Sequence, residues 1–282
     1  MDGDIGIPAS LRNGFVLVLS GGAVRGMAHL GFLNACEGKE LPIRAIVASS
    51  AGAIAGSLFA SPKCTIETVR KRILTLKKRQ MFRFGWSRSG IFDSEHTVDL
   101  LCDLIGSGAT FKDLLYPLTV TATSLRTRKL ILLESGEVGP AVAASSALPP
   151  FFTPVSQNGD TLVDGGLLSI LPVMAARARF PEIPVVSVNV NEHEDFQGVP
   201  APYPVSGFLP AGVSPISGNW LTLPLRLYGL GLYRTLQIEI SFSDWHIGIS
   251  GGRFSMSAIS CMDKLFQLGY DAGEQFVRFF DS

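Results

Sequence analysis

The sequence predicts an α/β fold in which helices cover both faces of a parallel β-sheet. Short, uninterrupted apolar runs, typical of strands that are buried on both faces, recur along the chain. Patterns typical of helices alternate with the first of these runs, which favours a parallel sheet with right-handed crossovers. Of the 282 residues, 46% are hydrophobic and 17% are charged, so a sizeable core is expected.

The first two strand–helix units are the clearest. Residues 15–19 (FVLVL) predict a buried strand, and a glycine-rich turn follows at once. A helix is expected at residues 27–37, because Gly38 stands where a left-handed cap would end it. Residues 43–48 predict the second strand, and Ser50 opens a second helix.

The later part of the chain contains further strands and one more helix. Runs of β-branched and aliphatic residues predict the strands. The expected elements are strands at residues 117–124, 129–134 and 184–190, a turn at 125–128, and a helix from Pro172, while residues 161–163 lead into the Asp-Gly-Gly turn. Residues 199–233 are rich in Pro, Gly and aromatic side chains, which is typical of an ordered insertion or a mobile flap. After a short lead, residues 1–14, we expect residues 15–282 to form a single domain.

Charge and cysteine content exclude several classes of protein. Lys plus Arg equals Asp plus Glu, at 24 each, so the basic bias of a nucleic-acid-binding protein is absent. The four cysteines include no Cys-x-x-Cys pair, so neither a disulfide framework nor a metal site is expected. The first residues lack an apolar signal sequence, and no apolar run is long enough to span a bilayer. These features favour a cytoplasmic protein.

Ser50 is a candidate nucleophile at the second strand-to-helix turn. Ala48 and Ser49 precede it and Ala51 and Gly52 follow it, so the turn can be tight enough to point the hydroxyl out of the sheet. The helix that begins there leaves backbone N–H groups free. Taken alone, a serine in this position is more often a simple helix N-cap.

A glycine-rich loop joins the first strand to the first helix. Its residues are Gly21, Gly22, Ala23, Val24, Arg25 and Gly26. Ligands gather beyond the carboxyl ends of parallel strands, so this loop and Ser50 should converge. A dinucleotide site does not fit, because Ala23 stands where a second glycine is required, and a P-loop does not fit because Gly-Lys-Ser/Thr is absent. Backbone donors for an oxyanion are the interpretation with the fewest exceptions.

The base that serves Ser50 is either Asp164 or a histidine. Asp164 precedes Gly165 and Gly166, which allow close approach to another backbone, although such a turn is more often only a turn. A carboxylate is a weak base, so burial beside Ser50 would have to raise its pKa. His193 follows a predicted strand, which keeps a Ser-His-Asp triad open, whereas the other three histidines look like surface or core residues.

Four sequence blocks together resemble the patatin-like phospholipases, in particular their single-domain bacterial members. In chain order they are SGGAVRGMAHLG, VASSAGAIAG, AASSALPPFFTPV and LVDGGLLSILPV. The resemblance implies a three-layer α/β/α sandwich with a mainly parallel sheet, and a Ser50–Asp164 dyad without histidine, metal or cofactor. It implies hydrolysis of acyl esters of phospholipids or related lipids through an acyl-enzyme. It assigns the N–H groups of Gly22 and Ala23 to an oxyanion hole and gives Arg25 the task of holding the loop in shape.

Three points stay open at this stage. Ala48 stands where the family has glycine, which leaves room for a non-catalytic lipid-binding or regulatory protein as well as for the Ser-His-Asp esterase using His193. Residues 63–88 hold nine basic residues and one acid among apolar side chains. This stretch is either a peripheral membrane contact or a solvated helix with one side on the core. Residues 199–233 either rim the acyl-chain entrance, as a lid does, or pack in the core.

Overall fold

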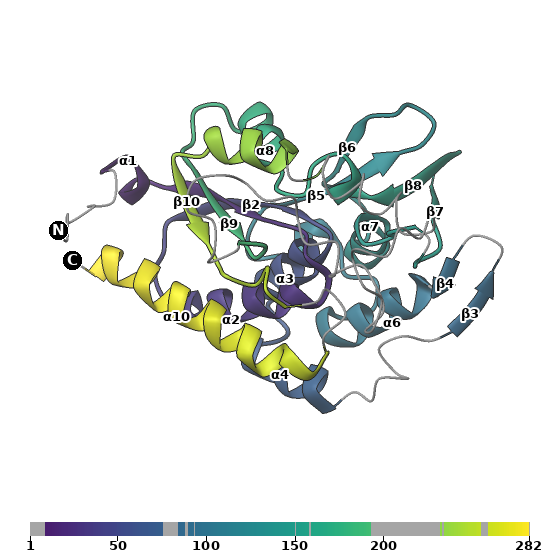
Figure 1. Ribbon diagram of the computed structural model, residues 1–282, viewed down its shortest axis with the longest axis horizontal. Coiled ribbons are helices and arrows are strands. Elements are labelled where there is room, and N and C mark those ends of the chain that lie inside the picture. Colours follow the sequence, from purple (N-terminus) through teal and green to yellow (C-terminus); the bar gives the residue numbers. More distant parts are fainter. Residues whose placement is uncertain are drawn as a thin grey trace, which may run out of the picture.

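The computed structural model describes residues 9–75, 84–87, 90–92, 94–149, 151–157, 159–192, 232, 234–254 and 259–281. Within these ranges an eight-stranded sheet lies between two layers of helices, as Figure 1 shows. The predicted three-layer α/β/α sandwich is therefore confirmed. His193 and, apart from Leu232, the predicted insertion at 199–233 lie outside the described residues.

The central sheet is parallel over most of its width and antiparallel at one edge. Its strands are β1 (Phe15–Leu19), β2 (Ile43–Ser49), β5 (Leu118–Ser124), β6 (Leu130–Leu133), β7 (Val155–Gln157), β8 (Asp160–Asp164), β9 (Val185–Asn189) and β10 (Trp245–Gly248). They follow the order β10-β9-β1-β2-β5-β8-β7, with β6 paired to β5 beside this path. The pairs from β10 to β5 are parallel, whereas β6, β7 and β8 join antiparallel. A separate hairpin consists of β3 (Phe84–Ser87) and β4 (Gly90–Phe92).

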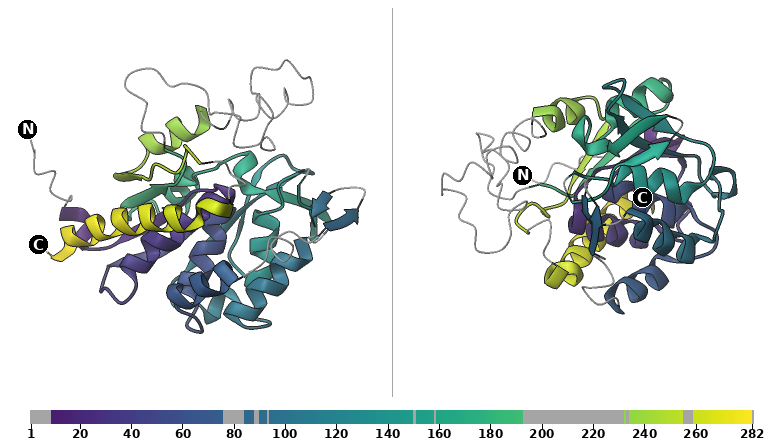
Figure 2. Two further views of the ribbon diagram at one scale, coloured as in Figure 1. Left: turned by 60° about the horizontal axis from the view of Figure 1, so that its bottom comes forward. Right: turned by 90° about the vertical axis from the view of Figure 1, so that its right-hand side faces the viewer.

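Helices cover both faces of this sheet. They are α1 (Ala9–Arg12), α2 (Gly26–Cys36), α3 (Ala51–Ala60), α4 (Ile66–Thr75), α6 (Ser94–Ile105), α7 (Val138–Ser145), α8 (Val173–Arg179) and α10 (Met262–Asp281). Residues 234–241 are also helical. Figures 1 and 2 show α2, α3, α4 and α10 on one face of the sheet, and α8 with the helix at 234–241 on the other.

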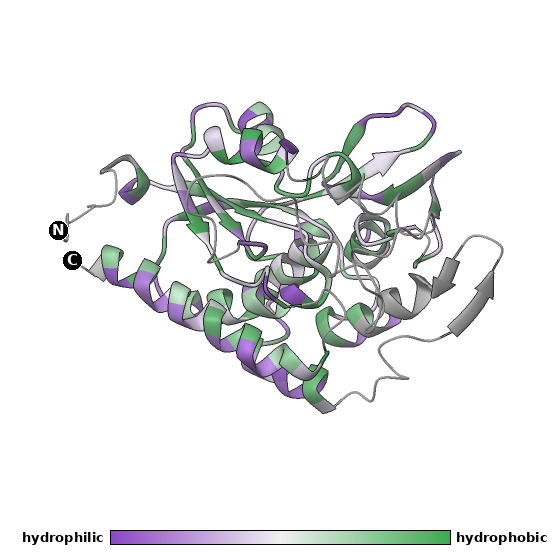
Figure 3. Cartoon of the chain, in the orientation of Figure 1, coloured by the Kyte–Doolittle hydropathy of each residue, from purple (hydrophilic) through white to green (hydrophobic). Residues whose placement is uncertain are grey.

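Alternate side chains of β1 enter two separate apolar clusters. Phe15, Leu17 and Leu19 face the cluster that includes α2, α3 and α10, whereas Val16 and Val18 face the cluster that includes α8. All five side chains are fully buried, which explains why this strand carries no polar alternation. Figure 3 shows the same contrast, with mainly hydrophobic central strands and an α10 of mixed hydrophobic and hydrophilic residues.

Helices α2 and α10 pack closely because glycines stand at their crossing. A β-carbon at Gly31 of α2 would overlap the carbonyl oxygen of Phe266, and one at Gly269 of α10 would overlap that of Ala28. The two backbones are therefore in direct contact, and the shape of these helices rather than a specific polar bond sets their spacing.

Gly269→Ala is expected to lower the free energy of unfolding by about 3 kcal/mol, because the added methyl group forces the two helices apart. The helix propensity of alanine alone would act in the opposite direction, by about 1 kcal/mol. Urea denaturation measures the difference, with Lys264→Ala on the exposed face of the same helix as the control. A loss below about 1 kcal/mol would mean that the helices do not approach this closely.

The described first part of the basic stretch 63–88 belongs to the fold. In α4, Ile66 and Val69 are fully buried. Arg70 pairs with Asp263 of α10 at 3.1 Å, and its guanidinium lies over the ring of Phe266. Residues 76–83 and 88 lie outside the described residues, so membrane contact by this stretch stays a prediction. Within the part of the chain that the structure describes, no helix is both long and apolar enough to cross a bilayer.

Candidate active site

Ser50 lies in a strained turn between β2 and α3. Its φ of 52° and ψ of −122° belong to a region that residues with a side chain rarely adopt. The Ser50 side chain forms no capping hydrogen bond with α3. Its Oγ instead donates to Oδ2 of Asp164 at 2.7 Å. Ser50 therefore stands at the N-cap position of α3, as the alternative interpretation expects, but its side chain does not cap the helix.

The residues beside Ser50 are tightly enclosed. Ala48 and Ser49 are fully buried in β2, and the Ser49 hydroxyl has no hydrogen-bond partner within the described residues. A β-carbon at Gly52 would lie 2.5 Å from the carbonyl oxygen of Leu19. The methyl group of Ala48 fits into the apolar core on the α3 side of the sheet, so the departure from glycine at this position is accommodated without loss of the turn.

Ser145, at the end of α7, supports the same turn and was not among the predicted site residues. The Ser50 N–H donates to Oγ of Ser145 at 2.8 Å, across 95 residues of sequence. This bond uses the first amide of the turn, so Ser50 does not offer its own N–H to a ligand. Ser145 lies in the block AASSALPPFFTPV that resembles the family, but no local pattern in the sequence indicates that it contacts this amide.

Asp164 ends β8 and is the hydrogen-bond partner of the nucleophile candidate. It is 3% exposed. Its Oδ2 accepts from Ser50, and its Oδ1 accepts from the N–H of Gly166 at 2.7 Å. Burial raises the pKa of the Asp164 carboxyl from 3.8 to about 6, while the two hydrogen bonds act in the opposite direction. The carboxylate is therefore a stronger base than an exposed aspartate, as the dyad requires.

The two glycines after Asp164 lie where a side chain would meet close neighbours. A β-carbon at Gly165 would overlap the carbonyl oxygen of Thr121, and one at Gly166 would lie 3.0 Å from Oδ1 of Asp164. The Thr123 hydroxyl donates to the carbonyl oxygen of Asp164 at 3.0 Å. The Asp-Gly-Gly turn is thus fixed to the strand on which it packs.

The glycine-rich loop lies directly beside Ser50. A β-carbon at Gly21 would lie 3.2 Å from Cβ of Ser50. The Gly21 N–H donates to the carbonyl oxygen of Ile170 at 2.7 Å, so this amide is not available to a ligand. Ala23 has a positive φ of 51°. Within the described residues, the N–H groups of Gly22, Ala23 and Val24 have no hydrogen-bond acceptor.

The buried side chain of Arg25 holds this loop in place. Its side chain is 1% exposed. The guanidinium donates to the carbonyl oxygens of Gly252 and Phe254 and to Oδ1 of Asn191, at 2.8 to 3.1 Å. These bonds agree with the structural role expected for Arg25. The loop then closes on α3, where a β-carbon at Gly26 would lie 2.8 Å from Cβ of Ala51.

Neither of the two histidines with described side chains contacts Ser50 or Asp164. His29 is buried in α2, where its Nε2 meets the carbonyl oxygen of Ser20 at 2.8 Å, and burial lowers its pKa to about 4. His246 lies on β10 with its Nδ1 2.8 Å from Oγ of Ser187. No group of three or more His, Cys, Asp or Glu among the described residues is arranged to hold a metal ion.

Comparison with known proteins shows which family this chain resembles. A family model described as patatin-like phospholipase matches residues 17–177. An uncharacterised NTE family protein of Mycobacterium tuberculosis is 31% identical over 181 residues, which cover 63% of this chain and 49% of the relative. The lysophospholipase NTE1 of Cryptococcus neoformans is 29% identical over 165 residues, which cover 57% of this chain and 10% of that protein. The chain thus spans at most about half the length of these curated relatives.

A solved structure has a similar fold. VipD of Legionella pneumophila matches 97% of this chain and 67% of its own, with a TM-score of 0.57 and 14% sequence identity. At this identity the likeness concerns the fold alone. The family model, by contrast, covers more than half of the sequence and includes the glycine-rich loop, Ser50 and Asp164. The chain belongs to the patatin-like phospholipase family.

Proposed function

We propose that the protein hydrolyses acyl esters of phospholipids or related lipids through a Ser50–Asp164 dyad. The observation that carries this proposal is the 2.7 Å hydrogen bond from Oγ of Ser50 to a carboxylate whose pKa burial raises to about 6. Near neutral pH this carboxylate is mostly ionised and still basic enough to accept a proton.

The reaction proceeds through an acyl-enzyme. Oγ of Ser50 attacks the ester carbonyl carbon while its proton passes to Oδ2 of Asp164. The tetrahedral intermediate collapses, the leaving alkoxide takes this proton, and the acyl group stays on Ser50. Water then attacks the acyl carbon and gives a proton to the same carboxylate. When this second tetrahedral intermediate collapses, Oγ of Ser50 leaves and takes that proton back from Asp164, which releases the fatty acid and restores the dyad. The Gly166 N–H holds Oδ1 throughout, so Oδ2 stays directed at Ser50.

The glycine-rich loop supplies the oxyanion hole. The N–H groups of Gly22 and Ala23 have no acceptor within the described residues, and the loop packs against Cβ of Ser50 through Gly21. Backbone amides that are held in place before the substrate binds stabilise the charge that develops on the carbonyl oxygen without reorganising. One such donor is typically worth about 3 to 4 kcal/mol in the transition state.

The substrate class rests on the family and on the name of a relative. The name of the Cryptococcus neoformans relative describes it as a lysophospholipase, and an acyl lipid is the substrate we propose here. We further propose that residues 15–282 act as one domain in the cytoplasm, and that residues 63–88 touch the membrane surface that holds the lipid. No cofactor takes part in the proposed reaction.

A fluorophosphonate probe and an ester panel test this proposal. The probe is expected to label Ser50, identified by the mass of its peptide, and the protein is expected to hydrolyse p-nitrophenyl esters and defined phospholipids. A non-catalytic lipid carrier stays unlabelled. His193→Ala is expected to keep the rate within about twofold, because the carboxylate contacts Ser50 directly. A large loss in this variant would favour the Ser-His-Asp esterase.

A further inference from the structure

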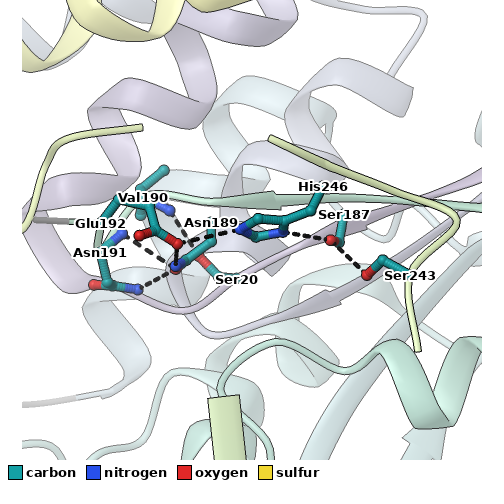
Figure 4. Close-up of polar contacts among 8 residues, drawn as sticks. All are labelled: Ser20, Ser187, Asn189, Val190, Asn191, Glu192, Ser243 and His246. Atoms are coloured by element: carbon teal, nitrogen blue, oxygen red, sulfur yellow. Dashed lines mark hydrogen bonds and ion pairs between the residues drawn. The ribbon is translucent and has the colours of Figure 1, made fainter. Parts of the chain in front are cut away.

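Two buried amide side chains at the end of β9 take no part in the reaction described above. Asn189 is fully buried and Asn191 is 3% exposed. A buried amide is unfavourable unless all its polar atoms find partners. Figure 4 shows these side chains in a chain of hydrogen bonds that reaches from β10 to the loop after β9.

The Asn191 amide is held in one orientation. Its Nδ2 donates to the carbonyl oxygen of Gly21 at 2.8 Å and to Oδ1 of Asn189 at 3.1 Å, while its Oδ1 accepts from Nη1 of Arg25 at 3.0 Å. A guanidinium only donates and a carbonyl only accepts, so the flipped amide would lose these bonds. The Asn191 side chain therefore forms hydrogen bonds with two residues of the glycine-rich loop, Gly21 and Arg25.

The bond to Gly21 determines where the next amide points. The carbonyl of Gly21 and the N–H of Gly22 belong to one planar trans peptide unit, so they point in opposite directions. With the Gly21 carbonyl directed at Asn191, the Gly22 N–H is directed to the opposite side of the loop. The Gly21 N–H, which belongs to the preceding peptide unit, is fixed as well, by the carbonyl oxygen of Ile170 at 2.7 Å, so Gly21 is held by hydrogen bonds on both sides.

We propose that Asn191 is a positioning residue that aims the Gly22 N–H at the oxyanion formed during attack by Ser50. The inference rests on the proposed function, because it assigns a task within the same site. Asn191 touches no reacting atom. It acts through the orientation of one peptide plane, and the oxyanion donor is ready before the substrate arrives.

The neighbours of Asn191 keep it in place. Oδ1 of Asn189 accepts from both the backbone N–H and Nδ2 of Asn191, at 3.1 Å each. Nδ2 of Asn189 donates to Oε1 of Glu192 at 2.9 Å, and Nε2 of His246 lies 3.2 Å from the same oxygen. This network ties Asn191 to β9 and β10, and Figure 4 shows its members side by side.

Asn191→Asp tests the proposal, because the carboxylate keeps the size of the side chain and its contact with Arg25 but cannot donate to Gly21 while ionised. We expect kcat for a p-nitrophenyl ester to fall about 10- to 100-fold and KM to change less than about threefold, since an oxyanion donor acts in the transition state. Asn34→Asp, the same change in a half-buried residue of α2, is the control and should leave both constants unchanged. Full kcat in the Asn191 variant, a loss confined to KM, or an equal loss in the control would overturn the proposal.

A second measurement on the wild-type protein does not depend on how the variant folds. After phosphonylation of Ser50, the Gly22 amide proton is expected to move downfield in the NMR spectrum, because it then donates to the phosphonyl oxygen. A labelled protein whose Gly22 amide does not move would refute the role of Asn191 while leaving the hydrolase proposal intact. A wild-type protein that neither hydrolyses esters nor reacts with the probe would refute the proposed function itself, and the role of Asn191 with it.

Discussion

Ser50→Ala is expected to lower kcat for ester hydrolysis by about 10⁴-fold or more, because it removes the only atom proposed to form the acyl-enzyme. The fold should tolerate the change. The Ser50 side chain forms no helix cap, and within the described part of the chain its Oγ bonds to Asp164, which serves the site rather than α3. The positive φ of 52° is no harder for alanine to adopt than for serine.

Steady-state assays with p-nitrophenyl esters measure this loss, and Ser57→Ala is the matched control. Ser57 is a buried serine on the same helix. Its Oγ donates to the carbonyl oxygen of Ile54 rather than to a residue of the proposed dyad. Its replacement should leave kcat within about threefold of the wild-type value. If Ser50→Ala kept more than about 1% of the activity, another nucleophile would have to be sought.

The sequence predicted that the glycine-rich loop and Ser50 meet, because both follow strands of a parallel sheet. The pairing of Ser50 with Asp164 rested on the Asp-Gly-Gly turn and the family resemblance, since Asp164 ends a strand, β8, that is antiparallel to β5. Strand β1 was predicted with its observed bounds, and β2 and β9 were predicted to within two residues at either end, since uninterrupted apolar runs mark strands buried on both faces. The carboxyl ends of parallel strands lie at one edge, so the glycine-rich loop and Ser50 had to converge. Gly38 has the left-handed φ of 74° that its place after α2 predicted.

Contacts between residues that lie far apart in the sequence were not predictable from local patterns. Ser145 contacts the Ser50 amide only because of the way in which α7 packs on the sheet. Asn191 donates a hydrogen bond to Gly21 across 170 residues of sequence, and no sequence pattern near either residue predicts this contact. The two strands joined by a turn at 125–128 were predicted, and β5 and β6 form this antiparallel pair. The antiparallel pairing of β7 and β8 was missed, because short strands of mixed polarity carry little information about their partners.

Asp164→Asn is expected to abolish activity and at the same time to stabilise the protein at pH 8. The amide cannot accept the proton of Ser50, so kcat should fall by about 10³-fold or more. Its shape preserves the local contacts, because Oδ1 can still accept from the Gly166 N–H and Nδ2 can donate to Oγ of Ser50. The wild-type rate should rise with pH through about 6 and then level off, as Asp164 ionises.

The gain in stability follows from the buried charge. Folding raises the pKa of Asp164 from 3.8 to about 6, so the native state favours the protonated carboxyl. The stability that this group contributes is fully present below about pH 3.8 and is lost as the pH rises through about 6. At about 1.4 kcal/mol for each pKa unit, the wild-type protein loses up to about 3 kcal/mol over this interval, whereas the uncharged amide loses nothing.

Urea denaturation at several pH values distinguishes this cause from a general effect of the substitution. The variant should exceed the wild-type protein by about 1 to 3 kcal/mol at pH 8, and the difference should shrink towards zero near pH 4. Asp160→Asn, at the other end of β8, provides the contrast. Hydrogen bonds led by the Ser124 hydroxyl hold the pKa of Asp160 below its usual range, so this change should destabilise the protein at pH 8. A variant of Asp164 that is less stable than the wild-type protein at pH 8 would show that the buried carboxylate does not destabilise the folded protein. The raised pKa of Asp164, on which the proposed reaction depends, would then lose its support.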